Sequence, residues 1–296
     1  WGIPQDRLSI SVYTDDDEAA SLWMDKIGVS PERLYRYGEE DNFWPASAPS
    51  KGPNGICGPC SEVYFDWYPE QGEYPPDGPA GDGHRFAEIW NLVFTQYDRQ
   101  ADGRLDPLPQ KNIDTGMGFE RVVRVLESLE KDCVLPSNFE TSLFAPLLRA
   151  IHEHIGQETT FGTPEGESVR RIADHVRAAT FCIADGVQPS NVKQGYVVRK
   201  ILRRAMVDRH RLGGDLRKPW LAELAGVTAD AMSNAWPDLS ERSAAIQSSI
   251  AAEEERFATS FLSATQRLEV MTEAARIAGL SVFPPDDSFL LYDTFG

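Results

Sequence analysis

The sequence is poor in cysteine, in positive charge and in long apolar runs. Its 296 residues include 4 Cys, and 29 Lys+Arg stand against 46 Asp+Glu, which gives a formal net charge of −17. A membrane-spanning helix needs about 18 or more nearly uninterrupted apolar residues. The longest apolar stretches here, such as Leu290-Leu291-Tyr292, meet a charge within a few positions. We therefore predict no membrane partner.

The four cysteines are too few for a disulfide framework in a chain of this length, and no signal peptide precedes them. A reducing, cytoplasmic setting is expected. Cys57 and Cys60 have the spacing of redox motifs, but redox chemistry favours a cysteine at a helix N-terminus, and residues 61–66 alternate like a strand. A zinc site would need two further ligands, and Cys133 and Cys182 are distant. A structural turn is the preferred interpretation.

The distribution of apolar residues predicts two domains and the α+β class. Residues 1–139 mix predicted strands (8–13, 61–66 and 85–97), loops (45–59 and 69–83) and a helix over 15–27 with Thr14 as N-cap. Residues 140–296 read as all-helical. The predicted helices there cover 141–155, 168–184, 195–212, 221–234 and 241–278, with a linker over 156–167.

The strongest predicted strand, 85–97, is apolar on both faces, which is typical of a central strand. Strict alternation places Ile89, Asn91 and Val93 on one face and Glu88 and Trp90 on the other. Asn91 therefore needs a hydrogen-bonding partner among buried neighbours, either protein or a ligand. Asp102-Gly103 is expected to turn the chain back toward a strand at Leu105.

A glycine-containing segment follows this strand and is expected to open a helix that runs to about Glu127. Gly116 and Gly118 would let a ligand approach the backbone, and the helix N-terminus offers free N–H groups to an anion. Arg121 could stack on a base or bind a phosphate. Asp114 is suited to hold an ammonium group. A glycine-rich helix start with a surface ion pair is the structural alternative.

Positive charge is concentrated in one block of this acidic chain. Residues 168–218 contain 12 Lys/Arg and 4 Asp/Glu, a local balance of +8. In the helix predicted over 195–212, Arg199 with Arg203, and Lys200 with Arg204, are like-charge pairs four residues apart, which destabilise an isolated helix. We interpret the block as a surface for a polyanion such as nucleic acid, against the alternative of a solvated helix face. The run Glu253-Glu254-Glu255 is predicted to be such a solvated face.

Several motifs together carry a resemblance to class II aminoacyl-tRNA synthetases, in the form found in alanyl-tRNA synthetases. Gly116-x-Gly118-x-Glu120-Arg121 resembles motif 3 of that class. The wider match covers essentially all 296 residues and includes these strings: Asp41-Asn42-Phe43-Trp44, Cys57-Gly58-Pro59-Cys60-Ser61-Glu62, Glu88-Ile89-Trp90-Asn91-Leu92-Val93-Phe94, Asp114-Thr115-Gly116-Met117-Gly118, Pro189-Ser190-Asn191 and Phe289-Leu290-Leu291-Tyr292-Asp293-Thr294-Phe295-Gly296.

The resemblance implies an adenylation site in residues 1–139, the C-terminal part of an antiparallel-sheet catalytic domain. L-alanine would be bound by a set of residues on the sheet and beside it, namely Trp44, Asn91, Val93, Asp114 and Gly116. ATP would be bound by Gly116, Gly118 and Arg121, with Mg²⁺ bridging its phosphates. No structural metal is implied for this chain.

The resemblance also implies that residues 140–296 are a tRNA-recognition domain. Asn191 matches a residue that contacts the acceptor stem, and its helix would hold flanking phosphates of tRNA(Ala) through Arg199, Lys200, Arg203 and Arg204. The implied function is that of an alanine–tRNA ligase; the alternative is a synthetase-derived RNA-binding module without activation chemistry. Motifs 1 and 2 of the class are not found here, so we expect a fragment that is inactive by itself.

Overall fold

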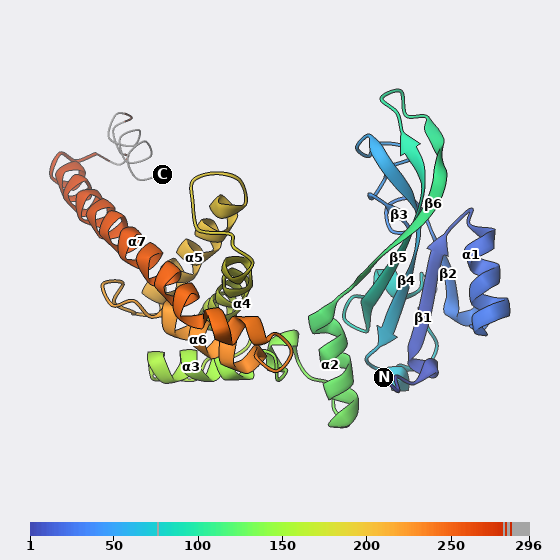
Figure 1. Ribbon diagram of the computed structural model, residues 1–296, viewed down its shortest axis with the longest axis horizontal. Coiled ribbons are helices and arrows are strands. Elements are labelled where there is room, and N and C mark those ends of the chain that lie inside the picture. Colours follow the sequence, from blue (N-terminus) through green and yellow to red (C-terminus); the bar gives the residue numbers. More distant parts are fainter. Residues whose placement is uncertain (76, 281, 283–284, 286–296) are drawn as a thin grey trace. The chain divides into compact units, whose positions relative to one another are not determined.

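A computed structural model describes residues 1–75, 77–280, 282 and 285 of the chain. The chain divides into two compact units, Trp1–Thr141 and Ser142–Gly296, and each is described by itself (Figure 1). The string 289–296 quoted above lies outside the described residues. In the described part no helix is long and apolar enough to cross a membrane.

The first unit is built on a mixed sheet with the strand order β2-β1-β4-β5-β6, and β3 pairs with β4 beside it. Among the strands of the described residues, only the β1–β2 pair is parallel. The strands are β1 (Leu8–Tyr13), β2 (Leu34–Tyr37), β3 (Phe43–Trp44), β4 (Gly55–Asp66), β5 (Phe86–Arg99) and β6 (Leu105–Met117). The turn predicted at Asp102-Gly103 is confirmed, since β6 begins at Leu105 and Gly103 has a φ of 86°.

Helices cover one face of this sheet. They are α1 (Asp17–Ser21), continued by a π-helical turn (Leu22–Ile27), and α2 (Phe119–Glu130); short 3-10 turns cover Gln5–Arg7, Pro31–Arg33, Pro69–Gln71, Pro79–Gly81 and Asn138–Glu140. The core of this face joins Ile10, Val63 and Ile89 of the sheet to Ala20 and Val125 of the helices. The opposite face carries the polar residues of the candidate site.

The first helix starts two residues later than predicted, because its N-cap is Asp16 and not Thr14. The Asp16 side chain accepts a hydrogen bond from the Ala19 amide at 2.9 Å, which satisfies one of the free N–H groups of the first turn. The Thr14 hydroxyl instead donates to the Tyr37 carbonyl of β2. Gly28 ends the helix in the left-handed region.

The loop predicted over 45–59 is wrong at its C-terminal end, because β4 already begins at Gly55. The pairing with β5 shifts register between Cys57 and Cys60, so the segment is a bulge within a strand and not a turn. Gly58 is required at this bulge: a Cβ there would lie 2.0 Å from the Phe94 carbonyl oxygen. The loop was predicted because proline and glycine crowd this segment, and the bulge accommodates these residues within a strand.

The second unit is all-helical in its described part. Its helices are α3 (Ala145–Ile155), α4 (Pro164–Ala184), α5 (Lys193–Arg211), α6 (Leu221–Met232) and α7 (Pro237–Ile277). The linker predicted over 156–167 is too long, because Thr163 caps α4 by accepting a hydrogen bond from the Gly166 amide. With the mixed sheet of the first unit, these helices confirm the α+β class.

The interpretation of residues 253–255 as a solvated face is wrong for two of the three. Glu253 and Glu254 are buried, whereas Glu255 is exposed. Glu254 accepts hydrogen bonds from the Trp220, Leu221 and Ala222 amides at 2.9–3.1 Å. It therefore caps α6 from a different helix, where the N–H groups of the first turn lack intrahelical partners.

Candidate adenylation site and nucleic-acid face

The floor of the candidate site is the polar face of β4, β5 and β6. Asn91 lies opposite Gly116, and Val93 lies opposite Asp114, in the antiparallel pair of β5 and β6. Side chains at directly opposed positions share a face of the sheet. The register therefore brings four of the predicted alanine-binding residues onto one patch.

A bulge in β5 adds a carboxylate to this face that strict alternation assigned to the other one. Val63 pairs with Trp90 but Tyr64 pairs with Glu88, so Ile89 is an extra residue in β5. Ile89 packs in the core cluster, and Glu88 lines a cavity on the polar face. The predicted placement of Ile89 and Glu88 is thus wrong, because one inserted residue inverts the alternation beyond it.

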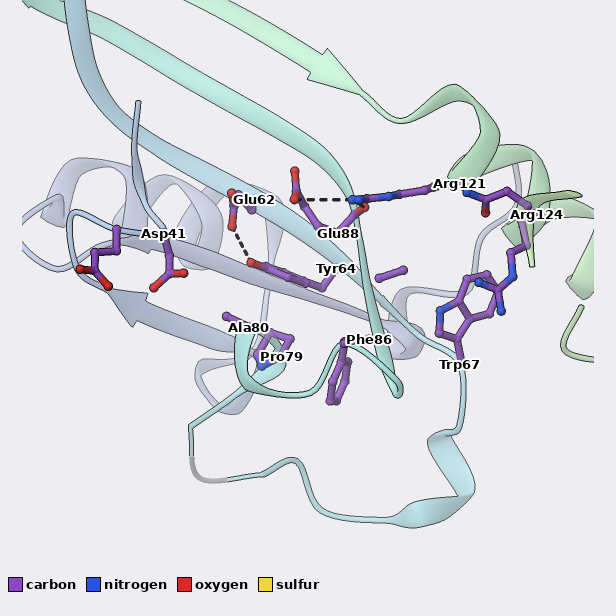
Figure 2. A pocket seen from close by; sticks show the side chains of 14 residues that line it. Asp41, Glu62, Tyr64, Trp67, Pro79, Ala80, Phe86, Glu88, Arg121 and Arg124 are labelled. Carbon is purple, nitrogen blue, oxygen red and sulfur yellow. Dashed lines mark hydrogen bonds and ion pairs between the residues drawn. The ribbon is translucent and has the colours of Figure 1, made fainter. Parts of the chain in front are cut away.

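The cavity has a volume of about 470 Å³ and is lined by charged side chains of both signs. Figure 2 shows Arg121 and Arg124 at one side of the cavity, Asp41 at the opposite side, and Glu62 and Glu88 between them. Arg124 lies over the Trp67 ring, 4.1 Å from its centroid, and donates to the Leu135 carbonyl. Such a mixed lining suits a ligand that carries both phosphate oxygens and cationic groups.

Arg121 is placed over this cavity by the start of α2. Its guanidinium donates to the Glu88 carbonyl at 2.7 Å and lies 3.6 Å from the Glu88 carboxylate. Gly118 is the N-cap of α2, and a Cβ there would lie 3.2 Å from the Arg121 side chain. The glycine thus lets the arginine pack against the backbone while half of its side chain stays exposed.

Glu62 links the cavity to the patch around Asn91. One Glu62 oxygen accepts from the Asn91 amide at 2.8 Å, and the other accepts from the Tyr64 hydroxyl. Burial raises the pKa of Glu62 to about 7, and repulsion from Glu88 and Asp41 adds to the effect, while the Tyr64 hydrogen bond opposes it. The Asn91 amide nitrogen therefore has a protein partner, whereas its buried side-chain oxygen has none among the described residues.

Asp114 and Gly116 lie in β6 itself, which extends further than predicted and ends at Met117. Asp114 is exposed, so its carboxylate is accessible to a ligand. A Cβ at Gly116 would meet nothing within 4 Å, so the fold of the first unit does not itself require glycine there. A ligand that lies close to the backbone at Gly116 would explain why this position is a glycine.

Trp44 borders the same region from β3. It pairs with Gly58, two residues before Cys60, and Cys60 pairs with Val93. Half of its side chain is exposed, whereas the preceding Phe43 is buried and packs edge-to-face on Tyr13. Trp44 is thus a half-exposed aromatic side chain on the strand that pairs with β4 close to the position opposite Val93.

The two cysteines of the bulge lie in buried positions of the described part of the chain. Cys57 and Cys60 are free, buried thiols in a strand. Burial raises the pKa of Cys60 to about 12, the opposite of what a reactive thiol needs. Among the described residues there is also no group of three or more His, Cys, Asp or Glu side chains that could hold a metal ion.

The predicted nucleic-acid residues lie on and just before α5, but they differ in accessibility. Lys200 and Arg204 are exposed, and Lys200 lies 5.9 Å from the centroid of the Tyr196 ring. Arg199 and Arg203 form ion pairs with buried Glu253 at 3.2 and 2.9 Å. The repulsion between these two arginines is therefore relieved by a carboxylate of the protein, and not only by a ligand as the pattern suggested.

Three acidic residues were missed as functional candidates: Glu62, Glu88 and Glu253. A spacing signal exists for the last one, because Ile246, Ile250, Glu253 and Phe257 recur as a helical stripe, and the stripe is buried. A glutamate within an apolar stripe predicts a buried, paired carboxylate. Glu88 had no such signal, since its face depends on the bulge at Ile89.

The chain belongs to the class II aminoacyl-tRNA synthetases: the family model "tRNA synthetases class II (A)" matches residues 1–296. It is 43% identical over 300 residues to an alanine–tRNA ligase of Chlorobium luteolum, covering 100% of this chain and 32% of the relative. The corresponding protein of Desulfosudis oleivorans is 43% identical over 299 residues, with the same coverage.

An alanine–tRNA ligase of Thermus thermophilus is 42% identical over 295 residues, which cover 98% of this chain and 32% of that relative. The chain thus spans about a third of the length of the curated relatives it matches. The match runs through both units and includes the β5–β6 patch and α5.

Proposed function

We propose that this chain is part of an alanine–tRNA ligase, which activates L-alanine with ATP and transfers it to the 3′ end of tRNA(Ala). One observation supports the proposed activation of alanine. The β5–β6 register places four predicted alanine-binding residues on one face of the sheet, namely Asn91, Val93, Asp114 and Gly116. This face adjoins the cavity that Arg121 lines. The named relatives support the choice of amino acid and of tRNA.

In the activation step, a carboxylate oxygen of alanine attacks the α-phosphate of ATP, and pyrophosphate leaves. Exposed Asp114 would hold the α-ammonium as an ion pair, and the Asn91 amide would hydrogen-bond the amino acid. Val93 and Trp44 would bound the space for a methyl side chain. Holding both substrates on one rigid sheet lowers the barrier by fixing the angle of attack.

Arg121 would bind ATP by stacking on the base or by contact with the γ-phosphate, and Gly116 and Gly118 would let the nucleotide approach the backbone. Mg²⁺ would neutralise the phosphates. Glu62 and Glu88 are carboxylates in the cavity, but the described residues hold no cluster of three potential metal ligands. The ion would be held mainly by the nucleotide phosphates and water, as Mg²⁺ often is.

The second unit would recognise the tRNA. Asn191 would contact the acceptor stem, and Arg199, Lys200, Arg203 and Arg204 would contact its backbone phosphates. Residues 1–139 would then be the C-terminal part of the adenylation domain and residues 140–296 the tRNA-recognition domain. A cytoplasmic setting fits the free thiols of the described cysteines.

Asp114→Asn in the full-length protein tests this assignment. Alanine-dependent ATP–pyrophosphate exchange should be lost, because a neutral amide does not pair with the ammonium, while binding of tRNA(Ala) stays unchanged. Glu70→Asn, at an exposed position of the same unit, is the control. Exchange that survives in Asp114→Asn refutes the pocket, and wild-type protein that binds tRNA without any exchange favours the RNA-binding module.

A further inference from the structure

Buried Glu253 of α7 is surrounded by three arginines from two helices. One carboxylate oxygen lies 2.9 Å from the Arg203 Nε and 3.2 Å from the Arg199 Nε of α5. The other accepts from both the Nε and a terminal nitrogen of Arg256, at 3.2 and 3.0 Å. The Glu253 side chain has no solvent exposure. We call Arg199, Arg203, Arg256 and Glu253 the arginine cluster.

The arginine cluster carries a net charge of +2, and its three arginines are exposed to solvent to different degrees. The exposed fractions of the side chains are 16% for Arg199, 37% for Arg203 and 56% for Arg256. Each arginine has five N–H donors, and Glu253 occupies only some of them. Donors of Arg203 and Arg256 therefore remain for an external acceptor, on side chains whose stems are already fixed.

The arginine cluster adjoins Asn191. A terminal nitrogen of Arg199 donates to the Asn191 side-chain oxygen. Arg256 also lines a shallow hollow with Gln188 and Pro189, just before Asn191, and with Ser249 of α7. The excess positive charge, the hollow and Asn191 thus form one continuous surface of the second unit.

We infer that the arginine cluster is a preorganised phosphate-binding surface for RNA, in which Arg256 of α7 is a contact residue and Glu253 is a positioning residue. This deepens the proposed function, on whose tRNA-binding role it rests. Arg199 and Arg203 already tie α5 to Glu253, and Arg256 lies on the same helix as Glu253, so a structural link between the two helices does not account for the third arginine. Fixed guanidiniums bind phosphate with less loss of side-chain entropy than mobile ones.

For the effect of Glu253→Gln on tRNA binding, the inference predicts the opposite sign to a simple charge argument. Glu253→Gln and Glu255→Gln each add one unit of positive charge on the same helix, but only Glu253 holds the arginines; Glu255 is exposed. If charge alone governs binding, both variants bind a tRNA(Ala) transcript more tightly. We expect Glu255→Gln to bind as well as or better than wild type, and Glu253→Gln to bind about tenfold more weakly, the equivalent of one charge-assisted contact. Equal or tighter binding by Glu253→Gln overturns the positioning role.

A second pair of variants tests the surface without disturbing the buried carboxylate. Arg256→Ala should lower the slope of log affinity against log salt by about 1, because one phosphate contact is lost. Arg276→Ala is the matched control, since Arg276 pairs with Glu273 on the same helix as Arg256 does with Glu253, but on exposed residues. If Arg256→Ala keeps the wild-type slope, the cluster is only a structural clasp. If wild type itself fails to bind the transcript, the proposed function fails instead.

Discussion

Glu62 provides the sharpest test of the electrostatics at the candidate site. Its pKa of about 7 lies well above the value of 4.5 for an unperturbed carboxyl group, because the folded protein buries it near Glu88 and Asp41. The folded state therefore retains a proton that the unfolded state has released. The resulting stability is fully present below pH 4.5 and is lost as the pH rises through 7.

The size of the effect follows from the two pKa values. Each unit of difference corresponds to about 1.4 kcal/mol, so ionisation of Glu62 alone should lower the free energy of unfolding of the first unit by up to about 3 kcal/mol between pH 4.5 and pH 7. Glu62→Gln removes the titration and keeps side-chain atoms that hydrogen-bond Asn91 and Tyr64. The variant should thus gain stability relative to wild type as the pH rises.

Urea unfolding of both proteins at several pH values between 4.5 and 8 measures this difference. Glu70→Gln, at an exposed position of the same unit, controls for the loss of one negative charge. The stability difference between Glu62→Gln and wild type should increase by about 3 kcal/mol across the range, and that for Glu70→Gln should stay nearly constant. A pH-independent difference for Glu62→Gln would refute the raised pKa and the closeness of the three carboxylates on which it rests.

Four further variants probe the fold and the two candidate surfaces. Gly58→Ala should destabilise the first unit by about 3 kcal/mol through overpacking against the Phe94 carbonyl, as measured by thermal unfolding. Gly116→Ala should fold normally but lose alanine-dependent exchange, as measured by the exchange assay. Glu254→Gln should cost the second unit about 3 kcal/mol, because it uncaps α6, and thermal unfolding at wild-type stability would contradict that role. Changing both Arg203 and Arg204 to Ala should weaken tRNA binding and flatten its salt dependence; an unchanged slope would mean that this part of α5 is only a solvated face.

The strands and helices were largely predictable because their signals are local. Residues 8–13 alternate and form β1 as predicted, and the predicted helix over 221–234 corresponds to α6. The errors within the sheet fall where one residue is inserted into a strand. The bulges at Cys57–Cys60 and at Ile89 depend on how many residues each of the two paired strands contributes. This pairing cannot be predicted from the sequence of one strand alone.

The pairing of Asn91 with Gly116 could not be predicted from the sequence for the same reason. A further register shift, in the pairing of β5 with β6, lies between Thr95 and Tyr97. Counting back from the turn at Gly103 would therefore place a different residue opposite Asn91. The patch of predicted alanine-binding residues was inferred from a resemblance, and the register accounts for it physically. Asn91 and Gly116 are 25 positions apart in the sequence. They lie opposite each other because β5 and β6 pair antiparallel with one register shift between them.

The basic block shows why a charge count along the sequence is a poor guide to a binding surface. Several of its arginines are neutralised by buried acids: Arg171 and Arg211 pair with Asp208, and Arg209 lies 3.8 Å from Glu254. Lys193, Lys200 and Arg204 form no ion pair with any described residue. The acids that matter most, Glu253 and Glu254, lie outside the block in the sequence. The positive charge that an RNA would meet is therefore smaller than +8, and its position is set by which acids α7 brings against α5.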